Sequence, residues 1–241
     1  MGNYKIFNSY RDQVEDANLL RGLPLYRFFK NEWEAECLLD GKVWISTLQK
    51  CRDFECPQQG DKKEGTSTYH QLHLSLDHRI VTEEDHLVLK HLRIDINLPP
   101  PGEFYNGSIN LSNNMLSEHI PNGFLLCTTN MPESLKAQSS EWRYGVEITL
   151  RQSKIFKLLT HAILRQNISI INSHHAWADY DTSRTYHDPL KKPQHLAFIK
   201  PDLHRSQAEY RFFWEAPHGY NYPDGILIDC PEIKPYLKKV F

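Results

Sequence analysis

The segment from Ser206 to Trp214 carries the residues whose types and spacing are best suited to chemistry. Gln207, Glu209 and Arg211 are two positions apart, and in an extended strand such residues project from one face. A carboxylate held there between an amide and a guanidinium can stabilise positive charge that develops on a substrate. The same spacing also fits a surface strand with an ion pair between Glu209 and Arg211, so the sequence leaves both interpretations open.

Short strands are the elements that must position these residues. The other face of the late strand carries Tyr210, Phe212 and Trp214, which predicts that this face packs into a core. Alternation, β-branched residues and aromatic residues predict strands at 25–29, 43–47, 69–76, 87–98, 124–128, 144–150, 196–199, 210–214 and 225–229.

Two helices are expected to cover these strands. One spans 31–39, where Asn31 and Glu34 have capping-box spacing and Gly41 follows as a terminator. The other spans 155–163, whose apolar residues follow helical spacing. The sequence therefore predicts an α+β fold of mixed, mostly antiparallel strands with a few covering helices.

Composition limits the classes of function. The 241 residues have a formal net charge of −2, so no bulk electrostatic attraction draws the chain to nucleic acid or anionic lipid. The five cysteines form no C-x-x-C pair, which favours a reducing compartment. The sequence lacks an apolar run of the ~18 residues that a membrane span needs, so we predict no membrane partner and a cytoplasmic location.

A single domain over 1–241 is expected, with an excursion or lid at 99–122. Three consecutive prolines at 99–101 interrupt any strand or helix. The residues from Asn106 to Asn122 are rich in Asn, Ser and Gly, which is typical of a surface loop.

Other catalytic patterns are poorly matched. The histidines lack metal-ligand spacing and no cysteine pair accompanies them, so no metal site is assigned. The sequence has neither a G-x-S-x-G nucleophile elbow nor a glycine-rich phosphate loop. The acidic residues Asp53, Asp61 and Glu64 keep open a metal-dependent nuclease as an alternative, with a solvated loop as the other interpretation of this cluster.

Three separated motifs together resemble the signature of the mono-ADP-ribosyltransferases. These are Tyr26-Arg27, Ser46-Thr47 and Gln207-x-Glu209, in the order arginine, Ser-Thr and Q-x-E. The late stretch from Lys200-Pro201 to Arg211 also resembles a K-P…E-x-E-Y-R strand of an uncharacterised bacterial domain family, with Gln in place of the first Glu.

The resemblance implies an ADP-ribosyltransferase-like split sheet and NAD as substrate. It implies that Glu209 and Gln207 are catalytic, and that Arg27, Tyr26, Ser46 and Thr47 bind NAD. It further implies an acceptor that is protein, nucleic acid or water, and a toxin-like or defence role.

Each motif also has a structural interpretation. Arg27 fits a surface ion pair, and Ser46 and Thr47 fit caps at a strand end. A non-catalytic binding module on the same fold therefore remains the second alternative, and the sequence predicts neither the acceptor nor the oligomeric state.

Overall fold

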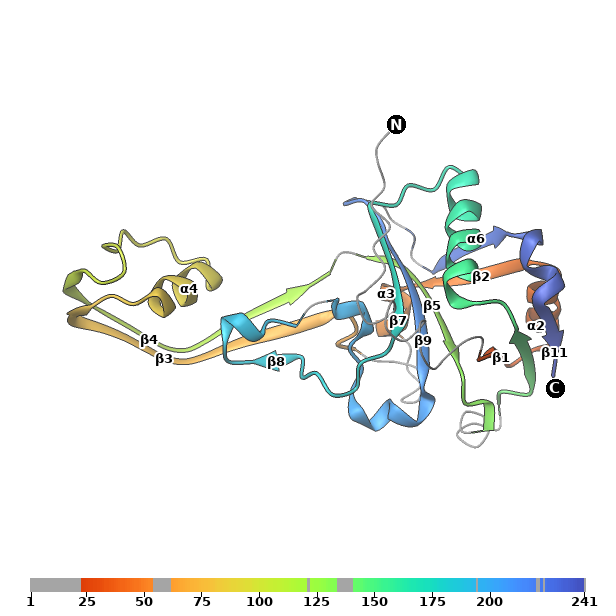
Figure 1. The fold of residues 1–241 in the computed structure, drawn as a ribbon, viewed down its shortest axis with the longest axis horizontal. Coiled ribbons are helices and arrows are strands. Elements are labelled where there is room, and N and C mark those ends of the chain that lie inside the picture. Colours follow the sequence, from red (N-terminus) through yellow and green to blue (C-terminus); the bar gives the residue numbers. More distant parts are fainter. Residues whose placement is uncertain are drawn as a thin grey trace. The chain divides into compact units, whose positions relative to one another are not determined.

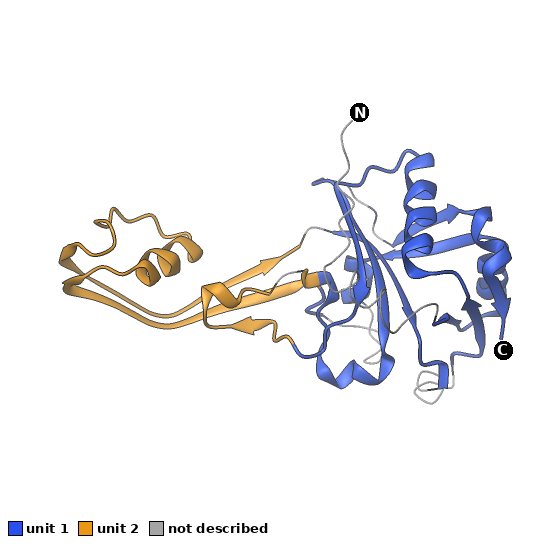
Figure 2. Ribbon diagram, in the orientation of Figure 1, with its two compact units in different colours: residues 1–64, 121–181, 197–241 blue, residues 65–120, 182–196 orange. Residues whose placement is uncertain are grey.

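The computed structural model describes residues 23–53, 62–120, 122–133, 141–193, 195–219, 222 and 224–240. The chain groups into two compact units, shown in Figure 2. Unit 1 comprises 1–64, 121–181 and 197–241, and unit 2 comprises 65–120 and 182–196. Where the sequence predicted one domain, two groups of residues thus make most of their contacts internally, and most of the excursion expected at 99–122 belongs to unit 2.

Unit 1 is an antiparallel sheet with helices packed against it (Figure 1). Its strands are β1 (Leu25–Phe29), β2 (Lys42–Thr47), β5 (Gly123–Thr129), β6 (Tyr144–Ile148), β7 (Asn172–Trp177), β9 (Glu209–Glu215), β10 (Gly225–Asp229) and β11 (Leu237–Lys239). Its helices are α2 (Glu32–Leu39), α3 (Leu48–Asp53) and α6 (Gln152–Arg165), with 3₁₀ turns η3 (Asp202–Gln207) and η4 (Pro231–Tyr236). The predicted α+β class with mostly antiparallel strands is confirmed.

The sheet of unit 1 forks at β5. Along one edge β5 pairs with β9 over its whole length, from Gly123 to Thr129. Along the other edge it pairs first with β2 and then with β1. The full order is β10-β2-β5-β1-β6-β11, and β9 branches from β5 and pairs with β7 along its other edge. Three segments far apart in the sequence therefore meet on one central strand.

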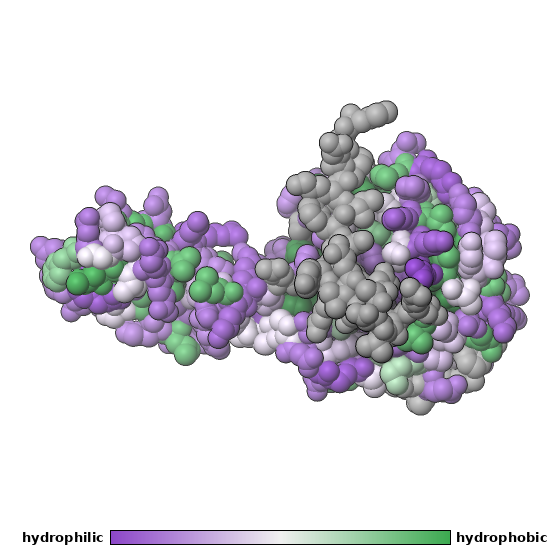
Figure 3. Space-filling view, in the orientation of Figure 1, coloured by the Kyte–Doolittle hydropathy of each residue, from purple (hydrophilic) through white to green (hydrophobic). Residues whose placement is uncertain are grey.

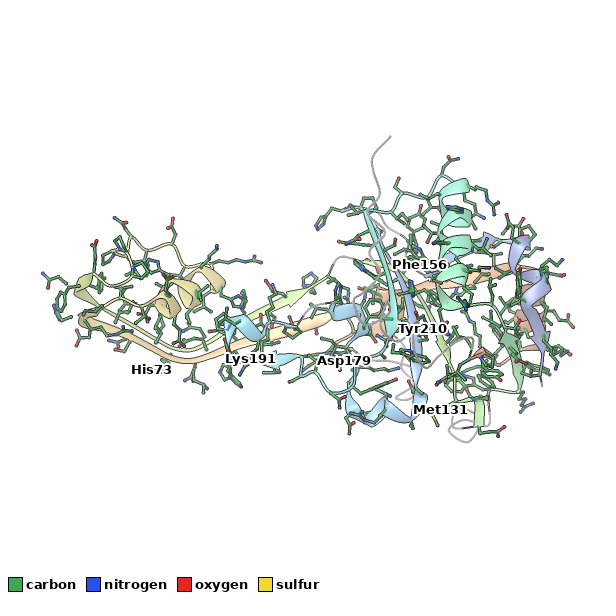
Figure 4. The ribbon with its side chains drawn as sticks, viewed as in Figure 1. His73, Met131, Phe156, Asp179, Lys191 and Tyr210 are labelled. Carbon is green, nitrogen blue, oxygen red and sulfur yellow. The ribbon has the colours of Figure 1, made fainter. Side chains whose placement is uncertain are left out.

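The predicted packing face of β9 is confirmed. Tyr210, Phe212 and Trp214 are buried, and helix α6 lies against them. The ring centroids of Phe156 and Trp214 are 5.8 Å apart, and Figure 4 labels Phe156 on α6 and Tyr210 on β9. The indole of Trp214 donates to the Thr160 hydroxyl at 2.8 Å, which satisfies the one polar group that this buried ring carries.

The start and end of α2 also follow the sequence. Asn31 and Glu34 form the expected capping box, and Gly41 has φ +77°. The predicted strand at 196–199 is wrong, because Leu196–Phe198 forms a 3₁₀ turn, η2, and only Ile199 makes an isolated bridge, to Asp179.

Unit 2 is built on a long hairpin of β3 (Thr66–Ile80) and β4 (Phe104–His119), with β8 (Thr185–Tyr186), helix α4 (Glu83–His91) and the 3₁₀ turn η1 (Pro189–Lys191). The strand predicted at 87–98 is wrong. Its first part belongs to α4, whose N-cap Thr82 forms a capping box with Asp85. Its second part lies outside any helix or strand. The Asn- and Ser-rich segment expected to be a loop mostly forms β4.

None of the helices in the described ranges is long and apolar enough to cross a membrane.

Candidate functional site

One cavity of unit 1, with a volume of about 460 Å³, brings most of the predicted site residues together. Residues from all three sequence motifs line it, namely Tyr26, Arg27, Ser46, Gln207 and Glu209. Thr47 does not line it. The three motifs, which are far apart in the sequence, thus lie around one cavity.

Pairing with β5 explains how the motifs meet. Tyr26 and Glu209 both pair with Thr129, from opposite edges of β5. Ser46 pairs with Leu125, four residues earlier on the same strand. Since paired strands lie roughly 4.8 Å apart, these pairings bring all three motifs within a short distance of one another.

A glycine positions the end of β2 that carries Ser46. Gly225 on β10 pairs with Ser46 and has φ +144°. A Cβ at this position would lie 2.3 Å from the Ile45 carbonyl oxygen. Only glycine therefore permits this close approach of β10 to β2.

Glu209 is the centre of an ionic network. One carboxylate oxygen accepts from the Lys200 ammonium at 2.5 Å, and the other accepts from Arg211 Nε at 2.9 Å. Burial alone would raise the pKa of Glu209, but the charges of Lys200 and Arg211 outweigh burial and lower it to about 2. The carboxylate is therefore ionised at neutral pH.

Arg211 and Glu64 complete this network inside the protein. The Arg211 guanidinium donates to both Glu64 oxygens, at 2.8 and 3.2 Å, and to the Ala197 carbonyl at 2.6 Å. Burial alone would lower the pKa of Arg211, but Glu64 and Glu209 raise it well above its ordinary value. With Lys200 the network holds two cations and two carboxylates, so its formal charge is zero.

Lys200 and Glu64 are the network residues whose roles the sequence did not reveal. Lys200 was visible only as part of a Lys-Pro motif, and Glu64 only as one acid of a metal-site alternative. The sequence separation of 147 residues between Glu64 and Arg211 shows why local spacing carried no signal of their pairing.

Gln207 reaches the cavity by a route that differs from the prediction. It ends the 3₁₀ turn η3 and does not belong to β9. Ala208, with φ 43° and ψ 55°, joins the turn to the strand in a left-handed conformation. The Gln207 amide oxygen accepts from Lys200, so this residue helps to hold the cation that contacts Glu209.

Arg27 brings a further positive charge to the cavity. Its guanidinium carbon lies 5.5 Å from the centre of the Phe29 ring, and it forms no ion pair or side-chain hydrogen bond with the residues that the structure describes. Burial lowers the pKa of Arg27 to about 10, with Cys127 and Glu34 opposing the shift. Arg27 is therefore charged at neutral pH and available to an anionic ligand.

The two hydroxyl residues of β2 have different surroundings. Thr47 is buried, and its hydroxyl accepts from the Lys50 backbone N–H at 3.1 Å, as a cap on the first turn of α3. Ser46 lines the cavity, and its hydroxyl forms no side-chain hydrogen bond within the described ranges.

The acidic cluster of the nuclease alternative is not assembled in the described part of the chain. Glu64 is paired with Arg211, and Asp53 accepts from the Gln49 amide. Asp61 lies outside the described residues. No group of three His, Cys, Asp or Glu side chains that could hold a metal ion occurs among the residues that are described.

A second cavity of unit 1, with a volume of about 410 Å³, also reaches Glu209. Its walls include Trp177, Tyr180 and Asn130. The Tyr180 hydroxyl accepts from the Glu209 backbone N–H at 3.0 Å. Among the described residues, Glu209 is the one that lines both of these cavities, and a molecule in either cavity would therefore meet it.

Acid should remove stability that depends on Glu209. The folded-state pKa of about 2 lies below the ordinary value near 4.5, so this stabilisation is complete above about pH 4.5 and is lost as the pH falls toward 2. The difference corresponds to about 3 kcal/mol. Tryptophan fluorescence during urea unfolding at pH 7 and pH 3 should show the loss, and Glu209→Gln should make the pH dependence shallower. An equal pH dependence in both proteins would contradict this assignment.

No family model, curated protein or solved structure matches the chain.

Proposed function

We propose that the chain binds NAD in the cavity of about 460 Å³ and cleaves the bond between ribose and nicotinamide. The observation that carries the proposal is that Arg27, Ser46 and Glu209, from three separated motifs, line one cavity. The ADP-ribose group then passes to a protein, a nucleic acid or water.

The positive charge and the aromatic side chains that line the cavity suit a dinucleotide. Arg27 has no carboxylate partner among the described residues, and a guanidinium binds diphosphate oxygens in a bidentate manner. The aromatic side chains of Trp44 and Trp142 also line the cavity and offer faces on which a base or nicotinamide ring can stack.

Glu209 keeps hydrogen-bonding capacity for the ribose. An ionised carboxylate has about four acceptor sites, and Lys200 and Arg211 occupy two of them. The remaining sites can accept from a ribose hydroxyl. A fixed carboxylate can stabilise the positive charge that develops on the sugar as the bond breaks, as carboxylates do in glycosidases.

The reaction balances without a metal or an oxidant. The bond between the ribose C1′ and the nicotinamide nitrogen breaks, and its electron pair leaves with neutral nicotinamide. A lone pair of the acceptor forms the new bond to C1′, and the acceptor loses a proton to solvent. The second cavity, which also reaches Glu209, gives an acceptor a separate approach.

A binding module without turnover is the second candidate, because the ionic network is closed. Lys200 and Arg211 already balance the charges of Glu209 and Glu64. Arg27 adds a positive charge that can attract an anionic ligand, and binding alone requires nothing more of Glu209.

Arg27→Ala should weaken NAD binding in titration calorimetry by roughly 10- to 150-fold, the range expected for a lost charge-assisted hydrogen bond. Arg27→Lys should lose less, because it keeps the charge but not the bidentate geometry. Arg143→Ala is the matched control, since Arg143 is exposed and does not line the cavity. Equal affinities of the Arg27→Ala protein and the wild type would refute this role.

A further inference from the structure

Two histidines and a methionine lie in one row across the three strands of unit 2. Met115 on β4 pairs with His70 on β3 in the antiparallel register. His187 directly follows β8, whose two residues pair in parallel with the two residues of β3 that precede His70. The same register therefore continues to His70 and His187, and Figure 1 shows β8 alongside β3.

These three side chains share the outer face of this part of the sheet. Tyr69 and Tyr186, which each precede one of the two histidines, are buried. Because successive residues of a strand point to opposite faces, His70 and His187 project away from that buried side. Met115 lies directly opposite His70 and so projects from the same face, and its side chain is 67% exposed.

The spacing of the two imidazole rings suits a shared ion. The ring centroids of His70 and His187 are 5.5 Å apart, and the ring planes make an angle of 46°. Two imidazoles that bind one ion at about 2.0 Å, with an angle of roughly 110–130° between the bonds, have ring centres roughly 5–6 Å apart. The rings therefore already stand at the separation that such a site requires.

A hydrogen bond fixes which nitrogen of His187 can bind a metal ion. Its Nδ1 lies 2.8 Å from the backbone carbonyl oxygen of His70. A carbonyl oxygen only accepts, so Nδ1 carries the proton and Nε2 of the neutral ring keeps its lone pair. Histidines that bind metals commonly donate their other N–H to a carbonyl in this way, which orients the ring. Within the described ranges the His70 ring has no hydrogen-bond partner.

A protein-docking surface explains the exposed Met115 less well. The two residues that share its row across the strands are polar histidines, so the methionine does not belong to an apolar stripe across the sheet. On the visible surface of unit 2, hydrophobic residues are scattered among hydrophilic ones and form no broad patch (Figure 3).

The donor atoms decide the class of metal. Histidine, cysteine, aspartate and glutamate form no group of three among the described residues, so the third ligand of this site is a methionine sulfur. A thioether is a soft ligand that selects Cu(I), and imidazole also binds copper. Two imidazoles and one thioether therefore suit Cu(I) better than the hard ions Mg²⁺ and Ca²⁺, which prefer oxygen ligands.

We propose that His70, His187 and Met115 bind one Cu(I) ion on the outer face of unit 2. Nε2 of His187, a ring nitrogen of His70 and the sulfur of Met115 are the ligands. The two histidines are 117 residues apart in the sequence, which explains why local histidine spacing did not indicate this site. The proposal is independent of the proposed function, because the cavity that would bind NAD is lined by residues of unit 1.

Competition of the full chain with a chromogenic Cu(I) chelator, under anaerobic reducing conditions, counts the bound ions. The wild type should bind one more Cu(I) ion per chain than H70Q/H187N, in which asparagine can still donate to the carbonyl but has no Nε2. Cysteine thiols also bind Cu(I), but they are the same in both proteins and cancel in the difference. The matched control H73Q changes an exposed histidine of β3 (Figure 4), three residues along the strand and therefore on the other face, and should bind as many ions as the wild type. Equal numbers of ions in the wild type and H70Q/H187N would overturn the proposal.

The Met115→Leu variant tests the sulfur ligand separately, because leucine has a similar volume and no sulfur. Ag(I) serves as the probe, since it is a soft ion that does not change oxidation state here. In ¹H–¹⁵N spectra of the histidine rings, Ag(I) should shift Nε2 of His187 and leave its Nδ1 protonated. The Ag(I) concentration that produces half of this shift should rise at least about tenfold in M115L. An unchanged titration in M115L, or a His187 ring that does not respond to Ag(I), would overturn the proposed ligand set.

Discussion

Replacing Glu209 by glutamine is expected to lower the rate of nicotinamide release from NAD by about 100- to 1000-fold. This is the range for removing one preorganised electrostatic group from an active site. The substitution keeps the shape of the side chain but removes the negative charge beside the developing sugar cation. Nicotinamide release, followed chromatographically, measures the effect directly.

The Glu209→Gln substitution should affect NAD binding and NAD turnover differently. The substitution leaves Arg211 paired with Glu64 but removes the carboxylate that pairs with Lys200, so the cavity gains one unit of positive charge. Affinity for the anionic dinucleotide should therefore hold or rise while turnover falls. If the chain is only a binding module, the wild type releases no nicotinamide and the variant differs in affinity alone.

Two controls keep this experiment decisive. Glu215→Gln changes the same residue type at the other end of β9, outside both cavities, and should leave the rate unchanged. Excess EDTA should also leave it unchanged, whereas a metal-dependent nuclease would lose its activity. A Glu209→Gln protein that releases nicotinamide as fast as the wild type would exclude the proposed mechanism.

Local patterns predicted the elements of unit 1 better than those of unit 2. The strand at 210–214 and the helix at 155–163 each have one clear period and one buried face, and both are confirmed. In β4 exposed and half-buried residues also alternate, but Ser112 and Asn113 are both exposed and interrupt the alternation. The composition of this segment, rich in Asn, Ser and Gly, resembled a loop.

The strand predicted at 87–98 failed because two signals competed. Alternating apolar residues favoured a strand, while Thr82 and Asp85 supplied a helix cap just upstream. The first part of the predicted segment forms a helix, and apolar residues of both parts pack together. Val88 and Leu89 on α4 are buried, and Ile94 and Ile96, which follow the helix, pack against the same hydrophobic cluster.

The candidate site was predictable in its motifs and not in its electrostatics. Spacing indicated Arg27, Ser46 and Glu209, which line one cavity. It gave no indication that Ala208 would adopt a left-handed conformation, because alanine is not a residue that favours it. Lys200 and Glu64 join the ionic network through tertiary contacts, which local sequence spacing does not reveal.

Replacing Arg211 by methionine is expected to destabilise unit 1 by about 3–5 kcal/mol, the cost of removing one member of a buried ion pair. The Arg211 side chain is 1% exposed and that of Glu64 is 3% exposed. Without the guanidinium, Glu64 remains buried beside an apolar side chain. All five tryptophans belong to unit 1, so tryptophan fluorescence during urea unfolding reports on this unit.

Burial is the variable that this prediction isolates. Arg165→Met is the matched control, because Arg165 also donates to both oxygens of a glutamate, Glu232, but the two side chains are 53% and 40% exposed. An exposed pair of this kind contributes about 0–1 kcal/mol. The double variant E64Q/R211M should recover part of the loss, since no buried charge is then left without its partner. Equal unfolding free energies for the Arg211→Met and Arg165→Met proteins would show that the network around Glu209 does not hold unit 1 together. The charge balance of this network would then be explained by ligand binding alone.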